Sequence, residues 1–211
     1  MKLQFGWMSL LLLIMCAFVS CADNVDDEEE YVDWQKKNEY AFIKQLEDAK
    51  DSIAQAREKY GDDWEAHCPW RVYRTYAQDE RVNGKAVDSI CMKKVSGEAK
   101  SAPAFYTDSI GVNYMLRLQP STSYPDGKVA DFSGPIPNES SVFHPDFCSP
   151  SKLAVSNTVE GFTTAAMHMG EGERWLVYIP HQLGYGSTES TAVPSYSMLT
   201  FDMQIVKIYR Q

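Results

Sequence analysis

The sequence is poor in positive charge, cysteine and histidine, and each shortage excludes a class of protein. Its 211 residues contain 20 Lys and Arg against 29 Asp and Glu, a formal net charge of −9. Affinity for nucleic acid rests on neutralising phosphates with Lys and Arg, so this balance argues against a nucleic-acid partner. No Cys-x-x-Cys pair occurs, and the four histidines show no spacing typical of a zinc site. We therefore expect neither a metal nor another cofactor, and we expect His168 and His181 to face solvent.

The most apolar run lies at the amino terminus and is short for a membrane-spanning helix. Lys2 is the sole charge before Asp23, and Leu10 to Val19 is almost purely apolar. This pattern predicts a secretory signal peptide over residues 1–20. Ser20-Cys21 then resembles a bacterial lipobox, which predicts that Cys21 becomes a lipidated first residue. The alternative is ordinary cleavage, which leaves Cys21 as a thiol.

Acidic residues crowd the segment that follows Cys21. Six of the nine residues at 22–30 are Asp or Glu, and a block of like charge repels itself and stays solvated. We interpret residues 21–30 as a lipid-anchored tether that holds a domain away from a membrane, with a surface-export signal as the alternative. These features predict a bacterial cell-envelope protein, lipid-anchored to the outer membrane on its periplasmic or surface face. Removing residues 1–20 takes away Lys2 and no acid, so 19 − 29 gives a net charge of −10.

Three cysteines lie beyond Cys21, and an odd set can form at most one internal disulfide. They are Cys68, Cys91 and Cys148. We expect a Cys68–Cys91 bond, since both flank the same predicted strand region, although spacing alone leaves the pairing open.

Residues 31–87 are predicted to form an extension that contains a helix and a hairpin. An apolar stripe at steps of three and four indicates one helix over residues 31–60, ended by Gly61. The stripe consists of Phe42, Leu46, Ala49, Ile53, Ala56 and Tyr60. It either docks on the chain's own domain or forms a homodimer seam. Residues 70–76 and 89–95 have strand-like composition, and Asn83-Gly84 between them is a hairpin-type turn signal.

Residues 88–211 are predicted to form the main domain. Residues 110–118 alternate as a strand does, Tyr124 to Gly127 fits a type I turn, and residues 132–150 form a long, proline-rich surface loop. A short helix from about Gly161 to Met169, a strand, two Pro-anchored loops and a final strand follow.

This order of parts resembles the FKBP family, the macrolide-binding peptidyl-prolyl cis-trans isomerases. The resemblance covers residues 88–211 and rests on VNYMLRL (112–118), DGKVADFS (126–133), PSKLAVSNTVEGF (150–162), LGYG (183–186), TAVP (191–194) and LTFDM (199–203). It implies an α+β fold in which a strongly bent antiparallel sheet of five or six strands, an FKBP-like half-barrel, wraps around the short helix. The N-terminal helix is an added extension.

The resemblance also assigns seven residues to a proline-binding pocket. Phe162 takes the place of the tryptophan that usually forms the pocket floor. Tyr185, through its hydroxyl, and Val159, through its backbone N–H, would be hydrogen-bond donors. The remaining pocket residues are Tyr114, Asp131, Val193 and Phe201.

A pocket of this kind suits rotation about an X–Pro bond. The barrier of about 18–20 kcal/mol comes from amide resonance, and no bond is made or broken, so no nucleophile or cofactor is needed. A dry, apolar pocket favours the twisted, less delocalised amide, and aimed donors hold its carbonyl. The resemblance thus implies an isomerase that assists extracytoplasmic protein folding by acting on flexible, proline-containing segments, with macrolides as further ligands.

Two positions depart from the family's pattern. Ala130 and Ser151 stand where the family has wall aromatics, and Phe132 would have to swing in to replace the first of them. A wider or wetter pocket implies reduced turnover. The alternative function is therefore a catalytically weak FKBP-like binding or chaperone module on the cell envelope.

Overall fold

The computed structural model describes residues 30–78, 83–134, 142–190 and 192–211. The predicted signal peptide lies outside these residues, as do Cys21 and all of the acidic tether except Glu30. The signal peptide, the lipid anchor and the tether therefore remain predictions. Residues 33–211 form one structural unit. Within the described part of the chain, no helix combines the length and apolarity needed to cross a membrane.

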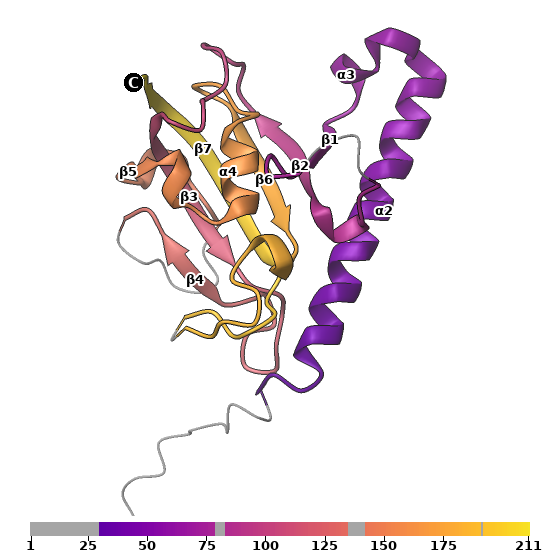
Figure 1. Ribbon diagram of the computed structural model, residues 1–211, viewed down its shortest axis with the longest axis vertical. Coiled ribbons are helices and arrows are strands. Elements are labelled where there is room, and N and C mark those ends of the chain that lie inside the picture. Colours follow the sequence, from indigo (N-terminus) through magenta and orange to yellow (C-terminus); the bar gives the residue numbers. More distant parts are fainter. Residues whose placement is uncertain (1–29, 79–82, 135–141, 191) are drawn as a thin grey trace, which may run out of the picture. The chain divides into compact units, whose positions relative to one another are not determined.

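The described residues form a seven-stranded antiparallel sheet (Figure 1). The path β1-β2-β6-β7-β3-β4 is continuous, and β5 pairs with β3. The strands are β1 Trp70–Arg74, β2 Ser89–Ser96, β3 Ser109–Arg117, β4 Val129–Phe132, β5 Ser151–Ala154, β6 Arg174–Ile179 and β7 Leu199–Tyr209. The α+β class is therefore confirmed, with more strands than the five or six expected. The added strand is β1, which extends the sheet beyond β2.

Helix α4, Glu160–Ala166, lies over one face of this sheet (Figure 1). All its residues from Gly161 to Ala166 are buried. Strand register aligns Met92, Val177, Phe201 and Leu116 across four strands, and aligned residues share a face. The Phe201 ring touches Phe162 of α4, so this row forms the core beneath the helix.

Helix α2, Trp34–Tyr60, covers the opposite face of the sheet at β1, β2 and β6. Phe42, Leu46 and Ala49 are buried against Cys91 and Met198. Because Cys91 neighbours Met92 along β2, its side chain points away from α4. The predicted helix is confirmed, and its stripe docks on the chain's own sheet. Of that stripe only Ile53, which is half-buried, and Tyr60, which is 37% exposed, keep surface for a second copy, so the homodimer stays a prediction.

The predicted hairpin pairs as expected but does not turn where expected. β1 and β2 are antiparallel, with Val72 opposite Cys91. However, β1 ends at Arg74 and β2 begins at Ser89, so Asn83-Gly84 lies inside a long connection and not in a two-residue turn. The turn prediction is wrong because β1 ends well before the dipeptide and β2 begins only after it.

The expected Cys68–Cys91 disulfide is also wrong, since Cys68, Cys91 and Cys148 are free. Cys91 faces Val72, which lies four residues beyond Cys68, so about 13 Å of extended chain separates the two positions. A disulfide needs Cα atoms within about 7 Å. Burial raises the pKa of the Cys91 thiol to about 12, so it stays protonated and chemically inert.

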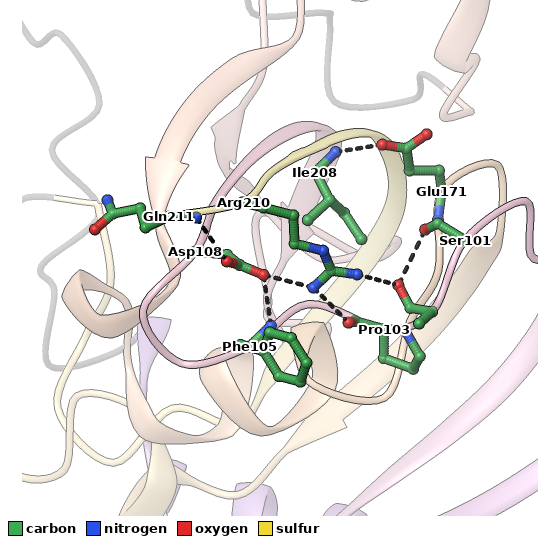
Figure 2. A network of polar contacts seen from close by, with 9 residues as sticks. Ser101, Pro103, Phe105, Asp108, Glu171, Ile208, Arg210 and Gln211 are labelled. Atoms are coloured by element: carbon green, nitrogen blue, oxygen red, sulfur yellow. Dashed lines mark hydrogen bonds and ion pairs between the residues drawn. The ribbon is translucent and has the colours of Figure 1, made fainter.

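A polar network fastens the carboxyl terminus to the loop before β3. Figure 2 shows the Arg210 guanidinium between the Asp108 carboxylate and the backbone of residues 102–103. Arg210 donates to Asp108 at 2.6 Å, and the backbone N–H groups of Phe105 and Gln211 donate to the same carboxylate. Asp108 is 1% exposed, and its backbone carbonyl accepts the Val155 N–H at 3.0 Å. The network thereby ties the end of β7 to the segment that leads into α4.

Candidate functional site

Three aromatic rings from three elements meet above the sheet. Tyr114 of β3, Phe162 of α4 and Phe201 of β7 have ring centroids 6.3, 6.0 and 5.1 Å apart in the three pairs, all edge to face. Each side chain is at most 9% exposed. The strand register explains the meeting, since Phe201 lies opposite Leu116 and Tyr114 opposite Met203, which puts both rings on the α4 face.

The Asp131 carboxylate borders this aromatic cluster, and Tyr185 interacts electrostatically with Asp131 and with Tyr114. The Tyr114 hydroxyl donates to Oδ2 of Asp131 at 2.9 Å. Burial, then the hydrogen bond to Asp131 and its charge, raise the pKa of Tyr114, while a hydrogen bond with Ser151 lowers it. Partial burial and the charge of Asp131 likewise raise the pKa of Tyr185, which is 43% exposed. Both hydroxyls therefore keep their protons near neutral pH and can donate.

The structure shows what lies around Ala130 and Ser151, the two positions that depart from the family pattern. Phe132 lies opposite Met115 on β3, and its ring centroid is 6.2 Å from that of Phe143. This places Phe132 on the face of the sheet away from Tyr114 and Asp131. It therefore does not replace the missing wall aromatic beside Ala130. Ser151 of β5 lies opposite Val112 of β3, and the Ser151 hydroxyl interacts with the Tyr114 hydroxyl.

Tyr185 and Val193 lie in the long connection between β6 and β7. The His181 carbonyl accepts the N–H groups of Gly184 and Gly186 at 3.0 and 2.8 Å, which brackets Tyr185. The Val193 carbonyl accepts the Ser190 N–H at 3.0 Å, and Val193 is 4% exposed. This segment thus forms turns stabilised by its own backbone.

The structure brings most of the seven predicted residues together. Tyr114, Asp131, Phe162 and Phe201 are in direct contact as one chain of neighbours, and Tyr185 lies within electrostatic reach of Asp131. Val159 immediately precedes α4, and its carbonyl accepts the Thr163 N–H at 2.9 Å. Val193 is buried in the same connection as Tyr185.

The expectation for His181 is wrong, whereas His168 is exposed as expected. His181 is only 8% exposed, and its Nε2 lies 3.2 Å from Glu39 of α2. The sequence contains one signal of this contact surface: Asn38 continues the apolar stripe four residues before Phe42, and a polar residue in a buried stripe needs a partner. Across the described residues, no group of three or more His, Cys, Asp or Glu side chains could hold a metal ion.

Comparison with known proteins gives concordant matches. The family model for FKBP-type peptidyl-prolyl cis-trans isomerases matches residues 108–206. The chain is 30% identical over 143 residues to the "Macrophage infectivity potentiator" of Trypanosoma cruzi, covering 65% of this chain and 64% of that protein. It is 28% identical over 133 residues to the FKBP-type 22 kDa peptidyl-prolyl cis-trans isomerase of Escherichia coli (strain K12), covering 63% and 55%.

A solved peptidyl-prolyl cis-trans isomerase from Pseudomonas syringae pv. tomato str. DC3000 aligns with a TM-score of 0.47 at 18% identity, covering 80% of this chain and 96% of that one. The chain spans less than two thirds of the length of these curated relatives, with shares of 64% and 55%.

Proposed function

Because the chain belongs to the FKBP-type peptidyl-prolyl cis-trans isomerase family, we propose that it accelerates cis–trans isomerisation of X–Pro bonds in flexible segments of other proteins. The observation that carries this proposal is the edge-to-face aromatic cluster of Tyr114, Phe162 and Phe201. The Tyr114 hydroxyl donates to Asp131, and Tyr185 interacts electrostatically with that carboxylate. Apolar walls with a few polar tips are what rotation about an amide requires, because the reaction needs desolvation and donors and no proton transfer.

In the proposed mechanism, Phe162 forms the floor on which the proline ring rests, and Phe201, Tyr114 and Val193 form the walls. Removing the amide from water favours the twisted state, in which conjugation between nitrogen and carbonyl is lost. The Tyr185 hydroxyl and the Val159 N–H donate to the turning carbonyl. Asp131 accepts a hydrogen bond from the Tyr114 hydroxyl, and this bond fixes the orientation of the tyrosine ring. Lowering the barrier by about 5 kcal/mol accelerates the reaction several-thousand-fold.

Replacing Tyr185 by phenylalanine is expected to lower kcat/KM about tenfold, because the variant keeps the ring and loses one donor to the transition state. A protease-coupled assay on a proline-containing peptide measures this change. Stability should stay within about 0.5 kcal/mol, since the Tyr185 side chain is 43% exposed. Tyr40→Phe is the matched control, because Tyr40 is 71% exposed on α2. Equal turnover of both variants would remove Tyr185 from the site.

A second candidate function is a binding or chaperone module with weak turnover. Ala130 and Ser151 favour it, because Phe132 lies on the opposite face of the sheet and a hydroxyl stands where the family has a ring. A more hydrated pocket loses part of the desolvation that drives the reaction. An intact fold without acceleration above the uncatalysed rate, together with suppressed aggregation of an unfolded client, would select this function over the first. Macrolides are a further proposed ligand class for the same pocket.

We place the protein in the bacterial cell envelope, anchored by a lipid on Cys21. The support is the residue pattern of 1–30: a charged start, an apolar run, Ser20-Cys21 and an acidic tether. Cells that process lipoproteins should incorporate a radiolabelled fatty acid into the wild-type chain and lose that label in Cys21→Ser. Label retained in the variant, or absent from both, would contradict the anchor.

A further inference from the structure

The segment that carries Tyr185 and Val193 is bonded to helix α2 at both ends of the segment. We call residues 181–190 and 192–198 the Tyr185 loop. Helix α2 lies outside the stretch 108–206 that matches the family model, so its contacts to this loop are additions to the family domain. The three hydrogen bonds that join α2 to this loop each span more than 140 positions of sequence.

The first end of the Tyr185 loop is held through His181. Its Nε2 lies 3.2 Å from Oε1 of Glu39, and its ring meets the Tyr196 ring edge to face at 5.3 Å. The His181 carbonyl accepts the N–H groups on both sides of Tyr185, from Gly184 and Gly186. The position of the imidazole and the path of the backbone around Tyr185 are therefore linked in one residue.

The second end is held by two buried hydrogen bonds. The Trp34 indole N–H donates to the Ser197 hydroxyl at 2.8 Å, and the Met198 N–H donates to Oδ1 of Asn38 at 2.7 Å. The Asn38 amide in turn donates to the Trp34 carbonyl at 2.7 Å. Met198 packs in the same cluster as Phe42, so polar and apolar contacts hold the end of the loop together.

We propose that Trp34, Asn38 and Glu39 of α2 are positioning residues for the isomerase site, acting through the Tyr185 loop. The inference rests on the proposed function. Tyr185 stands between two glycines, whose conformational freedom leaves the path of the chain to outside restraints. A displacement of about 1 Å in a catalytic donor can cost two orders of magnitude in rate. A helix anchored on the far face of the sheet adds restraints at both ends of the loop to the loop's own backbone hydrogen bonds.

The test compares Glu39→Ala, Glu39→Gln and Asn38→Leu in the full chain, with Glu47→Ala on the exposed side of α2 as the control. We expect kcat/KM to fall about threefold in Glu39→Ala and about tenfold in Asn38→Leu. Glu39→Gln should restore most of the activity, because its amide oxygen still accepts a hydrogen bond from His181. If the Glu39 carboxylate only stabilised the fold, kcat/KM of the Glu39 variants would change only together with their melting temperature. Rescue of kcat/KM by Glu39→Gln at an unchanged melting temperature would therefore not be seen.

Hydrogen exchange of the Gly184, Gly186 and Tyr196 amides gives a second, activity-independent measurement. Exchange at these amides should become faster in Glu39→Ala, while β7 amides keep their wild-type protection. Glu39 is only partly buried, so this variant folds even if Asn38→Leu does not. An inactive wild type would overturn the proposed function, whereas an active wild type with unchanged kcat/KM and loop exchange in Glu39→Ala would overturn this inference alone.

Discussion

Replacing Phe162 by alanine is expected to lower the free energy of unfolding by about 3–5 kcal/mol and to abolish turnover. Phe162 is 3% exposed and joins α4 to Tyr114 and Phe201. Truncation leaves a cavity between the helix and the sheet and removes the proposed floor for the proline ring. Urea unfolding measures the first effect, and the protease-coupled peptide assay, run where the variant is folded, measures the second.

Two further variants separate packing from catalysis at this position. Phe162→Leu keeps most of the volume and should cost about 1.5 kcal/mol while retaining measurable turnover. Phe147→Ala serves as the control, because Phe147 is 81% exposed and its loss should change stability by less than about 0.5 kcal/mol. Wild-type rates in folded Phe162→Ala would show that the aromatic cluster is only core.

Replacing Asp108 by alanine is expected to cost about 2–3 kcal/mol of stability. A buried ion pair that loses one partner typically costs 3–5 kcal/mol, and the Arg210 side chain is 38% exposed, so water offsets part of that loss. The variant also leaves the Phe105 N–H without its carboxylate acceptor. Urea midpoints at neutral pH measure the effect, and exposed Asp62→Ala provides the control.

The Asp108 carboxylate also makes the stability of the fold depend on pH in the acidic range. Burial pushes the pKa of Asp108 up, but the hydrogen bonds from Phe105, Arg210 and Gln211 outweigh it and hold the pKa below its ordinary value. A carboxyl group with a depressed folded-state pKa stabilises the fold above its unfolded value of about 4, and this contribution is lost as the pH falls through the folded pKa. Asp108→Asn should therefore flatten the fall in stability below about pH 4. An acid limb as steep as that of the wild type would contradict this assignment.

Local, periodic patterns predicted the elements that the structure confirms. The stripe of α2 repeats over several turns, and the alternation of residues 110–118 coincides with β3 Ser109–Arg117. The resemblance to the FKBP family placed Tyr114, Phe162 and Phe201 in one site, and their rings do meet. Each of these predictions depends on residues close in sequence or on a family pattern already known.

The open questions and the errors arose where the outcome depends on register or on distant partners. The sequence left open the face on which Phe132 lies, which follows from its pairing with Met115, and a shift of one residue would have reversed it. Cys68 and Cys91 flank one strand region, but the pairing of β1 with β2 puts them four positions apart. The buried His181 contacts Glu39, 142 positions away, and no pattern near His181 itself indicates that contact.

Tyr114 lies where two short strands share one edge of β3. β5 pairs with residues 109–112 and β4 with residues 115–117, while the backbone of Tyr114 bonds to Ser133. β4 supplies Asp131 and β5 supplies Ser151, so the two sides of the tyrosine come from separate pieces of chain. A substitution in either short strand would therefore alter one side of the proposed site alone, while the long β3–β7 pairing stays unchanged.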